Sequence, residues 1–254
     1  MPDEASHNLQ KAIEAIREKW GVHAIRHLKR PTDEPRVATG FDTLDRRLGG
    51  GLVRGRITEI VGAPTSGMAT LALKTVAQAQ SAGEMTVWLD LKETFDPEYA
   101  ARCGVLLDQL ILVRPPDLHQ APTLLAEFVA GDVGVLVCDL YLLELTAVAT
   151  ARALSSALER LLAPLGKSAT VFICLVSLPP GASPAAYAQS VALPHYATVR
   201  LELQRERWIH RRQDIRGYCA RVLIAKNKVG PANISVNVNI LFDDSLSGLH
   251  RDMA

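Results

Sequence analysis

Hydrophobic side chains recur at helical spacing near the start of the chain. Gly21 ends this pattern, and apolar and polar residues then alternate over 22–28, which predicts a short strand. Residues 29–37 contain two prolines and five charges, as expected of a linker. A helix and strand of this size cannot bury an apolar side alone, so they must pack on their own core or on another molecule. The apolar positions of the amphipathic helix are Leu9, Ala12, Ile13, Ile16 and Trp20.

The pattern changes from residue 38 onward, where runs of valine, isoleucine and leucine alternate with helical periods. Such strands, separated by helices, predict a mostly parallel sheet covered on both faces. We expect strands at 56–61, 85–90, 110–113, 134–139 and 169–175, and helices at 68–82, 97–103, 121–130 and 149–162.

Three strand-like runs without intervening helices follow residue 197, at 198–203, 218–225 and 234–240. They predict an antiparallel extension of the sheet. The expected fold is therefore an α/β core with a mostly parallel central sheet and an antiparallel C-terminal extension. The domain boundaries that we predict are an arm and linker at 1–37, a core at 38–243 and a tail at 244–254.

The composition is that of a folded intracellular domain. Of 254 residues, 48% are hydrophobic and 22% are charged, which excludes global disorder. The net charge of +1 gives no global attraction to nucleic acid, so DNA binding would need a local basic patch. No apolar run reaches ~18 residues and the first residues are not a secretory signal, so we expect a cytoplasmic protein without a membrane span.

The four cysteines lie far apart and form no C-x-x-C pair. We expect reduced thiols in the core rather than a metal or redox site. No metal and no cofactor are predicted. The cysteines are Cys103, Cys138, Cys174 and Cys219.

The segment after the first core strand has the glycine spacing of a phosphate-binding loop, G-x-x-x-x-G-K-[ST]. Gly62 and Gly67 would let the backbone wrap phosphates, and the amides at the start of the next helix would donate to them. However, Met68 occupies the position of the lysine and Ala69 that of the magnesium-binding hydroxyl. At ~4 Å and an effective dielectric of ~20, each lost charge pair is worth about 4 kcal/mol before desolvation.

The glycine spacing alone also occurs in ordinary strand–helix turns, but an aspartate ends a later hydrophobic strand, as a magnesium-coordinating aspartate would. The sequence therefore predicts a degenerate nucleotide site, formed by Gly62, Gly67, Met68, Ala69, Thr70 and Asp139.

Several segments in the same order resemble the RecA recombinase family. The runs 38–52 and 55–60 resemble the stretch before that family's phosphate loop, and 134–139 resembles its Walker B strand. Residues 222–229 resemble the strand that carries Lys-Asn-Lys, and 9–28 resembles the N-terminal polymerisation arm. Asp90 with 96–100 matches the family's next strand and helix, so the resemblance runs from about residue 8 to residue 242. It implies a RecA-like P-loop core.

The departures from this family concern the ATPase. The family's catalytic glutamate lies two residues after Asp90, where this chain has Lys92, and a lysine cannot activate water as a carboxylate does. Glu93 could substitute, but strand alternation would turn it to the other face. The family's nucleotide-sensing Asn-Gln pair becomes Leu175 and Val176. With the lysine and the hydroxyl also lost, we expect a pseudo-ATPase.

The competing expectation is an enzyme. In a RecA-like ATPase with a substituted cation, Lys92 or Lys74 would replace the missing lysine, and Lys92 is the better placed of the two because Lys74 lies about two helical turns beyond Gly67.

RecA-type proteins hold single-stranded DNA with two mobile loops. The corresponding segment 140–149 is mostly apolar, and 177–196 has no lysine or arginine, with Tyr187 more typical of packing. Strong DNA binding through these loops is not expected. A separate stretch from 204 to 228 carries eight positive and two negative residues. It is a solvated hairpin, a weak DNA-binding patch or a docking surface for an acidic partner. The DNA-contact candidates are Arg205, Arg207, Arg211, Arg212 and Arg216.

Lys226 and Lys228 resemble the lysine pair that reaches the ATP of the neighbouring subunit in RecA filaments. Two charges on an edge strand are the plain alternative. Because the chain keeps this pair and the arm while losing its own nucleotide chemistry, we expect it to dock onto a true RecA. The RecA-contact candidates are Leu9, Ile13, Ile16, Ile25, Lys226 and Lys228.

The pattern of losses, together with a chain that ends shortly after the last strand, resembles the ImuA-type RecA paralogues of bacterial mutagenesis cassettes. This resemblance implies a damage-response accessory protein that binds RecA and an ImuB-type homologue of Y-family polymerases. Such a protein supports translesion synthesis with a DnaE-type polymerase and joins the nucleoid when bound to these partners. The third expectation is a DNA-binding module that acts without RecA.

Overall fold

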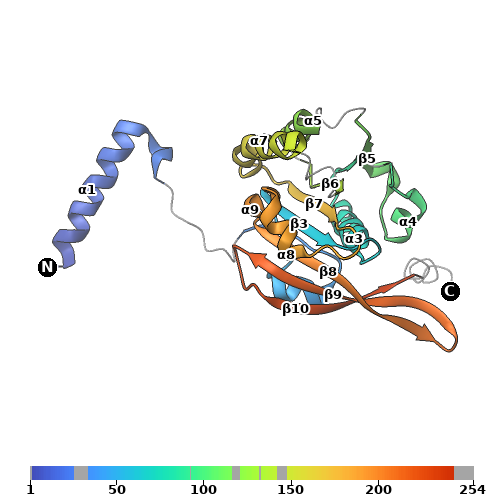
Figure 1. Ribbon diagram of the computed structural model, residues 1–254. Helices are drawn as coiled ribbons and strands as arrows, with labels where there is room; N and C mark the ends of the chain where they lie inside the picture. Colours follow the sequence, from blue (N-terminus) through green and yellow to red (C-terminus); the bar gives the residue numbers. More distant parts are fainter. Residues whose placement is uncertain are drawn as a thin grey trace, which may run out of the picture. The chain divides into compact units, whose positions relative to one another are not determined.

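The computed structural model describes residues 2–25, 34–91, 93–115, 121–131, 133–141 and 148–242. The chain divides into two compact units, Met1–Glu34 and Pro35–Ala254. The first unit consists of the helix α1 (Pro2–Trp20) and the short 3-10 helix η1 (Val22–Ala24), as Figure 1 shows. Among the described residues, no helix has the length and apolar character that crossing a membrane requires.

Helix α1 confirms the amphipathic helix, but the strand expected at 22–28 is wrong over the residues described. Gly21, at φ 87°, ends the helix, and Val22–Ala24 form a 3-10 turn closed by the Ala24 amide on the Gly21 carbonyl at 3.1 Å. Residues 26–28 lie outside the described part. In the part that is described, no strand pairs with this stretch, so local hydrogen bonds take the place of a ladder.

The second unit is built on an eight-stranded sheet in the order β10-β9-β8-β3-β7-β6-β4-β5. The strands from β8 to β5 run parallel to one another, while β9 and β10 are antiparallel to their neighbours. The predicted α/β fold with an antiparallel extension is therefore confirmed. The strand bounds are β3 (Arg56–Gly62), β4 (Thr86–Asp90), β5 (Leu110–Val113), β6 (Val135–Tyr141), β7 (Val171–Ser177), β8 (Val199–Arg211), β9 (Asp214–Asn227) and β10 (Ile234–Leu241).

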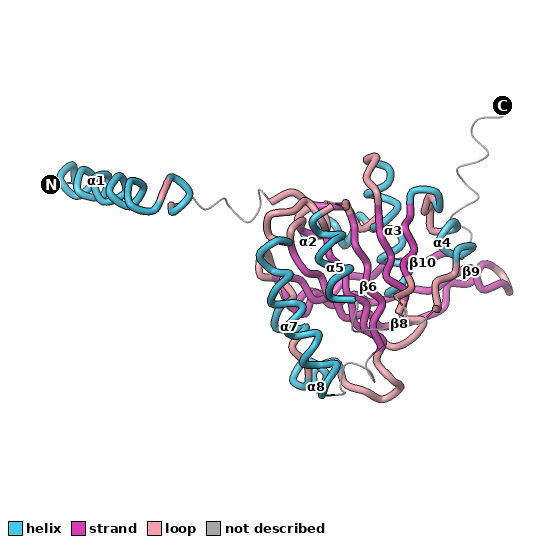
Figure 2. The backbone as a smooth tube through the Cα atoms, turned by 90° about the horizontal axis from the view of Figure 1, so that it is seen from above, coloured by secondary structure: helices cyan, strands magenta, loops and turns pink. Residues whose placement is uncertain are grey.

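Helices cover both faces of the sheet and enclose two hydrophobic cores. One core lies under α2 (Asp42–Leu48), α3 (Met68–Ser81) and α4 (Pro97–Arg102). The other lies under α5 (Ala121–Ala130), α7 (Val148–Leu165), α8 (Pro184–Ser190) and α9 (Leu193–Tyr196). Figure 2 shows α3 and α4 on one side of the sheet and α5, α7 and α8 on the other.

Smaller elements complete the unit: a two-stranded antiparallel ribbon of β1 (Arg36–Val37) and β2 (Leu52–Val53), and the 3-10 helix η3 (Leu107–Gln109). All four cysteines are buried and free, which confirms them as core thiols. Burial raises the pKa of the Cys103 and Cys138 thiols, so neither is an activated nucleophile.

The β8–β9 hairpin is longer than predicted, because both strands continue into charged residues beyond the apolar runs at 198–203 and 218–225. Its register shifts between Arg205 and Arg207 and again between Ile209 and His210. Such bulges bend the strands locally. Figure 1 shows the distal half of this hairpin extending beyond the helices of the unit.

Candidate functional site

The loop between β3 and α3 has the glycines of a phosphate loop, and its backbone conformation and packing require them. Gly67 has a left-handed φ of 104°, and a Cβ there would lie 2.5 Å from Cδ1 of Ile240. A Cβ at Gly62 would lie 2.5 Å from the Leu203 carbonyl oxygen. Strands β8 and β10 thus press directly on the loop. The retention of both glycines is explained without any nucleotide.

The two residues after Gly67 lack the groups with which a phosphate loop binds a magnesium nucleotide. Met68 is only 6% exposed and belongs to the hydrophobic core, while Ala69 faces solvent. The hydroxyls of Thr70 and Tyr99 share a hydrogen bond of 2.5 Å, and burial raises the pKa of Tyr99 to about 12. Met68 and Ala69 supply neither the cation nor the hydroxyl that a magnesium nucleotide needs, and the next hydroxyl is engaged by Tyr99.

A cavity of about 680 Å³ lies beside this loop. Loop residues form one wall, and Asp139 from the end of β6 lines it as the sequence predicted. The remaining walls are largely aromatic. These aromatic residues come from α4, from the β8–β9 hairpin and from the end of β10: Tyr99, Trp208, Tyr218 and Phe242.

Three of these aromatic rings pack in series, and the first of them contacts an arginine. Trp208 meets Tyr218 nearly edge to face, with centroids 5.9 Å apart, and Tyr218 meets Phe242 at 6.1 Å. The Arg205 guanidinium lies 4.5 Å from the Trp208 ring centre, and its Nη1 donates to Thr65 Oγ1 at 3.4 Å. Arg205 is therefore a cation in contact with the loop.

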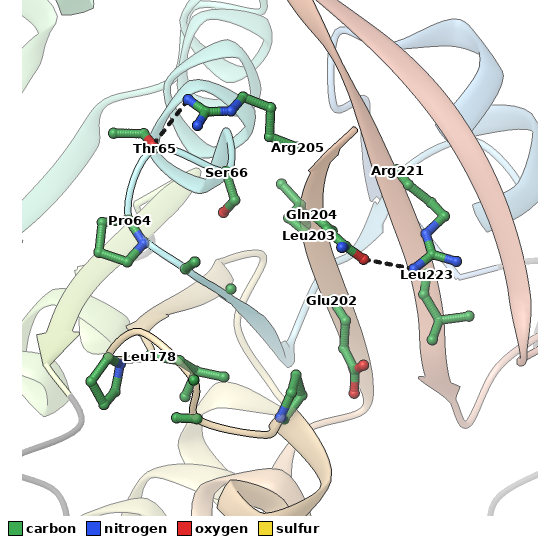
Figure 3. Close-up of a pocket in the computed structure, with 16 residues that line it drawn as sticks. Pro64, Thr65, Ser66, Leu178, Glu202, Leu203, Gln204, Arg205, Arg221 and Leu223 are labelled. Carbon is green, nitrogen blue, oxygen red and sulfur yellow. Dashed lines mark hydrogen bonds between the residues drawn. The ribbon is translucent and has the colours of Figure 1, made fainter. Parts of the chain in front are cut away.

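A second cavity of about 420 Å³ lies on the other side of the loop (Figure 3). The Ser66 hydroxyl is buried there and has no hydrogen-bond partner within the part of the chain that the structure describes. Arg221 also lines it but is compensated, because it donates to Gln204 at 2.7 Å and pairs with Glu206 at 3.4 Å. The charge of Arg221 is thus largely neutralised by the chain itself, while Arg205, which lines this cavity as well, contributes a second cation.

Asp90, the last residue of β4, is engaged in structural hydrogen bonds. Asp90 is buried and accepts hydrogen bonds from the Thr94 and Phe95 amides and from Arg114, at 3.0, 3.2 and 3.0 Å. It fixes the turn after the strand. The expectation that strand alternation turns Glu93 away is wrong in its reason, because β4 ends at Asp90 and Glu93 stands in a turn at φ 54°.

Of the two lysines proposed as substitute cations, Lys92 lies outside the described residues. Lys74 is placed over the Phe41 ring at 5.7 Å and lines neither cavity beside the loop. The sequence missed Arg205 as the loop cation because the two segments are 140 residues apart and meet only through the sheet.

The segment 177–196 is folded rather than a loop. Ser183 caps α8 and Pro184 occupies its first turn, which are ordinary helix-start signals. Tyr187 is buried and donates to Glu59 Oε1 at 2.6 Å, which confirms it as a packing residue. The segment expected at 140–149 lies largely outside the described residues, which exclude 142–147.

The two lysines of the Lys-Asn-Lys segment reach the same feature, the end of α9. Lys226 Nζ donates to the Pro194 and His195 carbonyls at 2.6 and 3.1 Å, and burial lowers its pKa. Lys228 is exposed and lies 3.4 Å from the His195 carbonyl. The structure brings the pair together, while its contact with a neighbouring subunit stays a prediction.

The remaining predicted contact residues fall into separate places. Arg207, Arg211 and Arg212 are exposed on the distal hairpin and Arg216 is half-buried. On the first unit, Leu9 is 63% exposed, and its apolar neighbours are half-buried: Ile13, Ile16 and Ile25.

Comparison with known proteins places this geometry among relatives. Residues 7–247 match the family model of the RecA N-terminal domain. The chain is 36% identical to Protein RecA of Parvibaculum lavamentivorans over 262 residues, which cover 94% of this chain and 72% of that one. It is 32% identical to Protein RecA of Paracoccus denitrificans over 275 residues, covering 97% and 77%.

The fold is also similar to a solved structure. The crystal structure of the RadB recombinase superposes with a TM-score of 0.63 over 82% of this chain and 97% of that one. Sequence identity is 19%, so this likeness concerns the fold alone.

Proposed function

Because this chain belongs to the RecA family, we propose that it is a non-catalytic RecA-like accessory protein that binds RecA in the bacterial DNA-damage response. One observation carries the proposal. The phosphate loop keeps its backbone, but its lysine position holds a methionine that is packed into the core. This pattern of losses resembles that of the ImuA-type RecA paralogues.

The loss of ATP chemistry rests on several positions that act together. Met68 brings no charge to a γ-phosphate, and Ala69 brings no ligand to magnesium. Lys92 stands where a carboxylate would activate water. A single substitution could be compensated elsewhere in the site, whereas these remove binding and hydrolysis together. A pseudo-ATPase follows.

The proposed RecA contact uses one side of a head-to-tail assembly, in which each subunit presents two different surfaces. The apolar side of α1, which includes the exposed Leu9, supports packing on a neighbouring RecA. Lys228 is exposed and supports a charge-assisted contact with the neighbour's ATP. The opposite surface, at the degenerate loop, offers the next subunit no phosphates. The chain would thus cap or modulate a RecA filament.

Its wider role is proposed from the ImuA-type pattern of losses. The chain would also bind an ImuB-type homologue of Y-family polymerases and support translesion synthesis in the cytoplasm, at the nucleoid.

The experiment that tests the RecA contact measures association with RecA from the same bacterium, with ATP and without nucleotide. We expect association only with ATP, because the proposed lysine contact needs the neighbour's phosphates. Lys228→Ala should weaken it about tenfold, as the loss of a charged hydrogen bond does. Deleting residues 1–28, which belong to a separate unit, should also weaken it.

Lys228 is preferred to Lys226 for this test because Lys226 also holds α9 through two carbonyls. The exposed Lys167 supplies the matched control, and Lys167→Ala should leave association unchanged. If the Lys228 variant and the deletion bind RecA as well as the intact chain, the contact lies elsewhere.

A second candidate function is favoured by Arg205. Its guanidinium donates to Thr65 in the loop, so an arginine in place of the lysine would give a RecA-like ATPase or an anion-binding site. Calorimetry with magnesium and ATP decides between the two: binding that Arg205→Gln abolishes would favour this candidate.

A further inference from the structure

The cavity beside the loop is an apolar, aromatic cleft whose edge is exposed to solvent. Met68 and Tyr99 form its inner part, and Trp208 and Phe242 remain 43% and 40% exposed at its edge. Clustered apolar side chains on a surface mark binding sites more often than scattered ones do. Its volume, about 680 Å³, is in the range of pockets that enclose a ligand group.

We propose that this cleft binds an acidic peptide segment of a partner protein, which inserts a bulky apolar side chain beside Met68 and places its carboxylates near Arg205 and the positively charged hairpin. The inference rests on the proposed function only in that the cleft holds no magnesium nucleotide.

The apolar lining explains the inserted side chain. Aromatic rings and a methionine give a large contact area to a leucine or phenylalanine anchor, and such anchors carry much of the free energy of peptide binding. Trp208 and Tyr218 are held against each other edge to face, so the wall on the hairpin side is already ordered before binding. Little conformational entropy would be lost there.

The charge of the hairpin explains the acidic flanks. Residues 205–216 contain five arginines and two carboxylates, which gives a net charge of +3. One carboxylate, Glu206, is paired with Arg221 at 3.4 Å. Arg205 borders the cleft itself, whereas Arg207 and Arg211 alternate with Trp208 along β8 and lie on the other face of the same exposed hairpin. An acidic segment whose anchor has entered the cleft would meet Arg205 directly and the net positive charge of the hairpin around it.

Single-stranded DNA fits the cleft less well than a peptide. Bases bind by stacking on open ring faces, but the Arg205 guanidinium already covers a face of Trp208 at 4.5 Å. The lining therefore favours a hydrocarbon side chain over a nucleotide.

The test measures anisotropy of a short fluorescein-labelled peptide in which aspartates and glutamates flank a Leu-Phe pair. The full chain is used, and a peptide with Ser-Ser in place of Leu-Phe is the ligand control. Trp208→Ala with Phe242→Ala removes the exposed rims, and Ala69→Trp fills the cleft from a solvent-facing position. Trp20→Ala, at an exposed tryptophan of the first unit, is the protein control.

We expect the Leu-Phe peptide to bind about tenfold or more tightly than the Ser-Ser peptide, as loss of an anchor predicts. Both cleft variants should lose the same factor, and Trp20→Ala should lose none. Arg207→Glu with Arg211→Glu should weaken binding and reduce its salt dependence. Far-ultraviolet circular dichroism checks that each variant is folded.

The inference is overturned if the two peptides bind alike, if neither binds, or if the cleft variants bind as the intact chain does. It is also overturned if oligothymidine displaces the peptide and needs Trp208 to do so. A separate titration with magnesium and ATP keeps the two proposals apart: displacement of a bound peptide by ATP contradicts the proposed loss of nucleotide binding, whereas the peptide measurements made without ATP test the cleft by itself.

Discussion

Glu59 is a buried carboxylate in the middle of β3, and its partners hold α8 against the sheet. Tyr187 donates to one carboxylate oxygen at 2.6 Å, and Arg200 lies 3.4 Å from the other. Desolvation raises the pKa of Glu59, while the Tyr187 hydroxyl and Arg200 oppose that rise. Arg200 also donates to the Pro184 carbonyl at 2.6 Å, at the start of α8. The network fixes the start of α8 against β3.

Tyr187→Phe removes the hydroxyl and leaves a carboxylate oxygen of Glu59 without its donor. We expect the free energy of unfolding to fall by about 1–3 kcal/mol, the usual cost of an unsatisfied buried group. Denaturant titration measures it. Tyr196→Phe is the matched control, because the Tyr196 hydroxyl donates to Glu159 at 2.7 Å on the surface. Equal losses of unfolding free energy in both variants would contradict the stabilising role of the buried Glu59 network.

Tyr99 makes the stability of the folded chain depend on pH in the alkaline range. Burial raises its pKa from 10.0 to about 12, so the folded state favours the neutral phenol. The stability that this contributes is complete below pH 10 and is lost as the pH rises through about 12. Denaturant titrations of the intact chain and Tyr99→Phe should therefore converge over this range, with the intact chain losing more. Parallel loss in both would show that Tyr99 does not titrate with unfolding.

At the scale of elements, the sequence predicts those strands that consist of one continuous apolar run. The strand β5 (Leu110–Val113) begins and ends where its apolar run does, although it is an edge strand whose residues are half-buried or exposed. Helices α8 and α9 were missed because Pro179-Pro180-Gly181 and Pro184 read as turn signals, although Ser183-Pro184 is also a helix start. The contact of Arg205 with the loop depends on sheet order and on a bulge in β8, and neither can be read locally.

The β8–β9 hairpin carries the prediction on DNA. Charge reversal of its arginines should remove most of a weak, salt-steep retention of single strands, because phosphate contacts there are electrostatic. Removing one arginine–phosphate pair should lower the slope of log affinity against log salt by about 0.7. The substituted residues are Arg205, Arg207, Arg211 and Arg212.

Filter retention over a series of salt concentrations measures this slope. Arg160→Glu, at an exposed arginine of α7, is the control and should change little. If replacing the segment 178–186 abolishes DNA retention and reversing the arginines does not, the electrostatic account of the hairpin is wrong.

At the scale of the whole molecule, the chain keeps the RecA fold but lacks the lysine and the hydroxyl of the phosphate loop. The sheet order, the lysine pair and the loop glycines persist because they are parts of the fold: Gly62 and Gly67 are packed under β8 and β10, and Lys226 holds α9. Met68 packs in the core and Ala69 faces solvent, and neither supplies a group that binds a nucleotide. Under the proposed function, the chain would present RecA-like surfaces to RecA and contribute no nucleotide of its own to the assembly.

The most direct test of this account measures magnesium-ATP binding by calorimetry and phosphate release by the full chain, beside RecA from the same bacterium. With Met68 and Ala69 in the loop, we predict no binding under conditions that saturate RecA and no release above buffer. Asp139→Ala should then change neither signal. Turnover comparable to that of RecA, abolished by Asp139→Ala, would contradict the claim that this RecA-family core is non-catalytic.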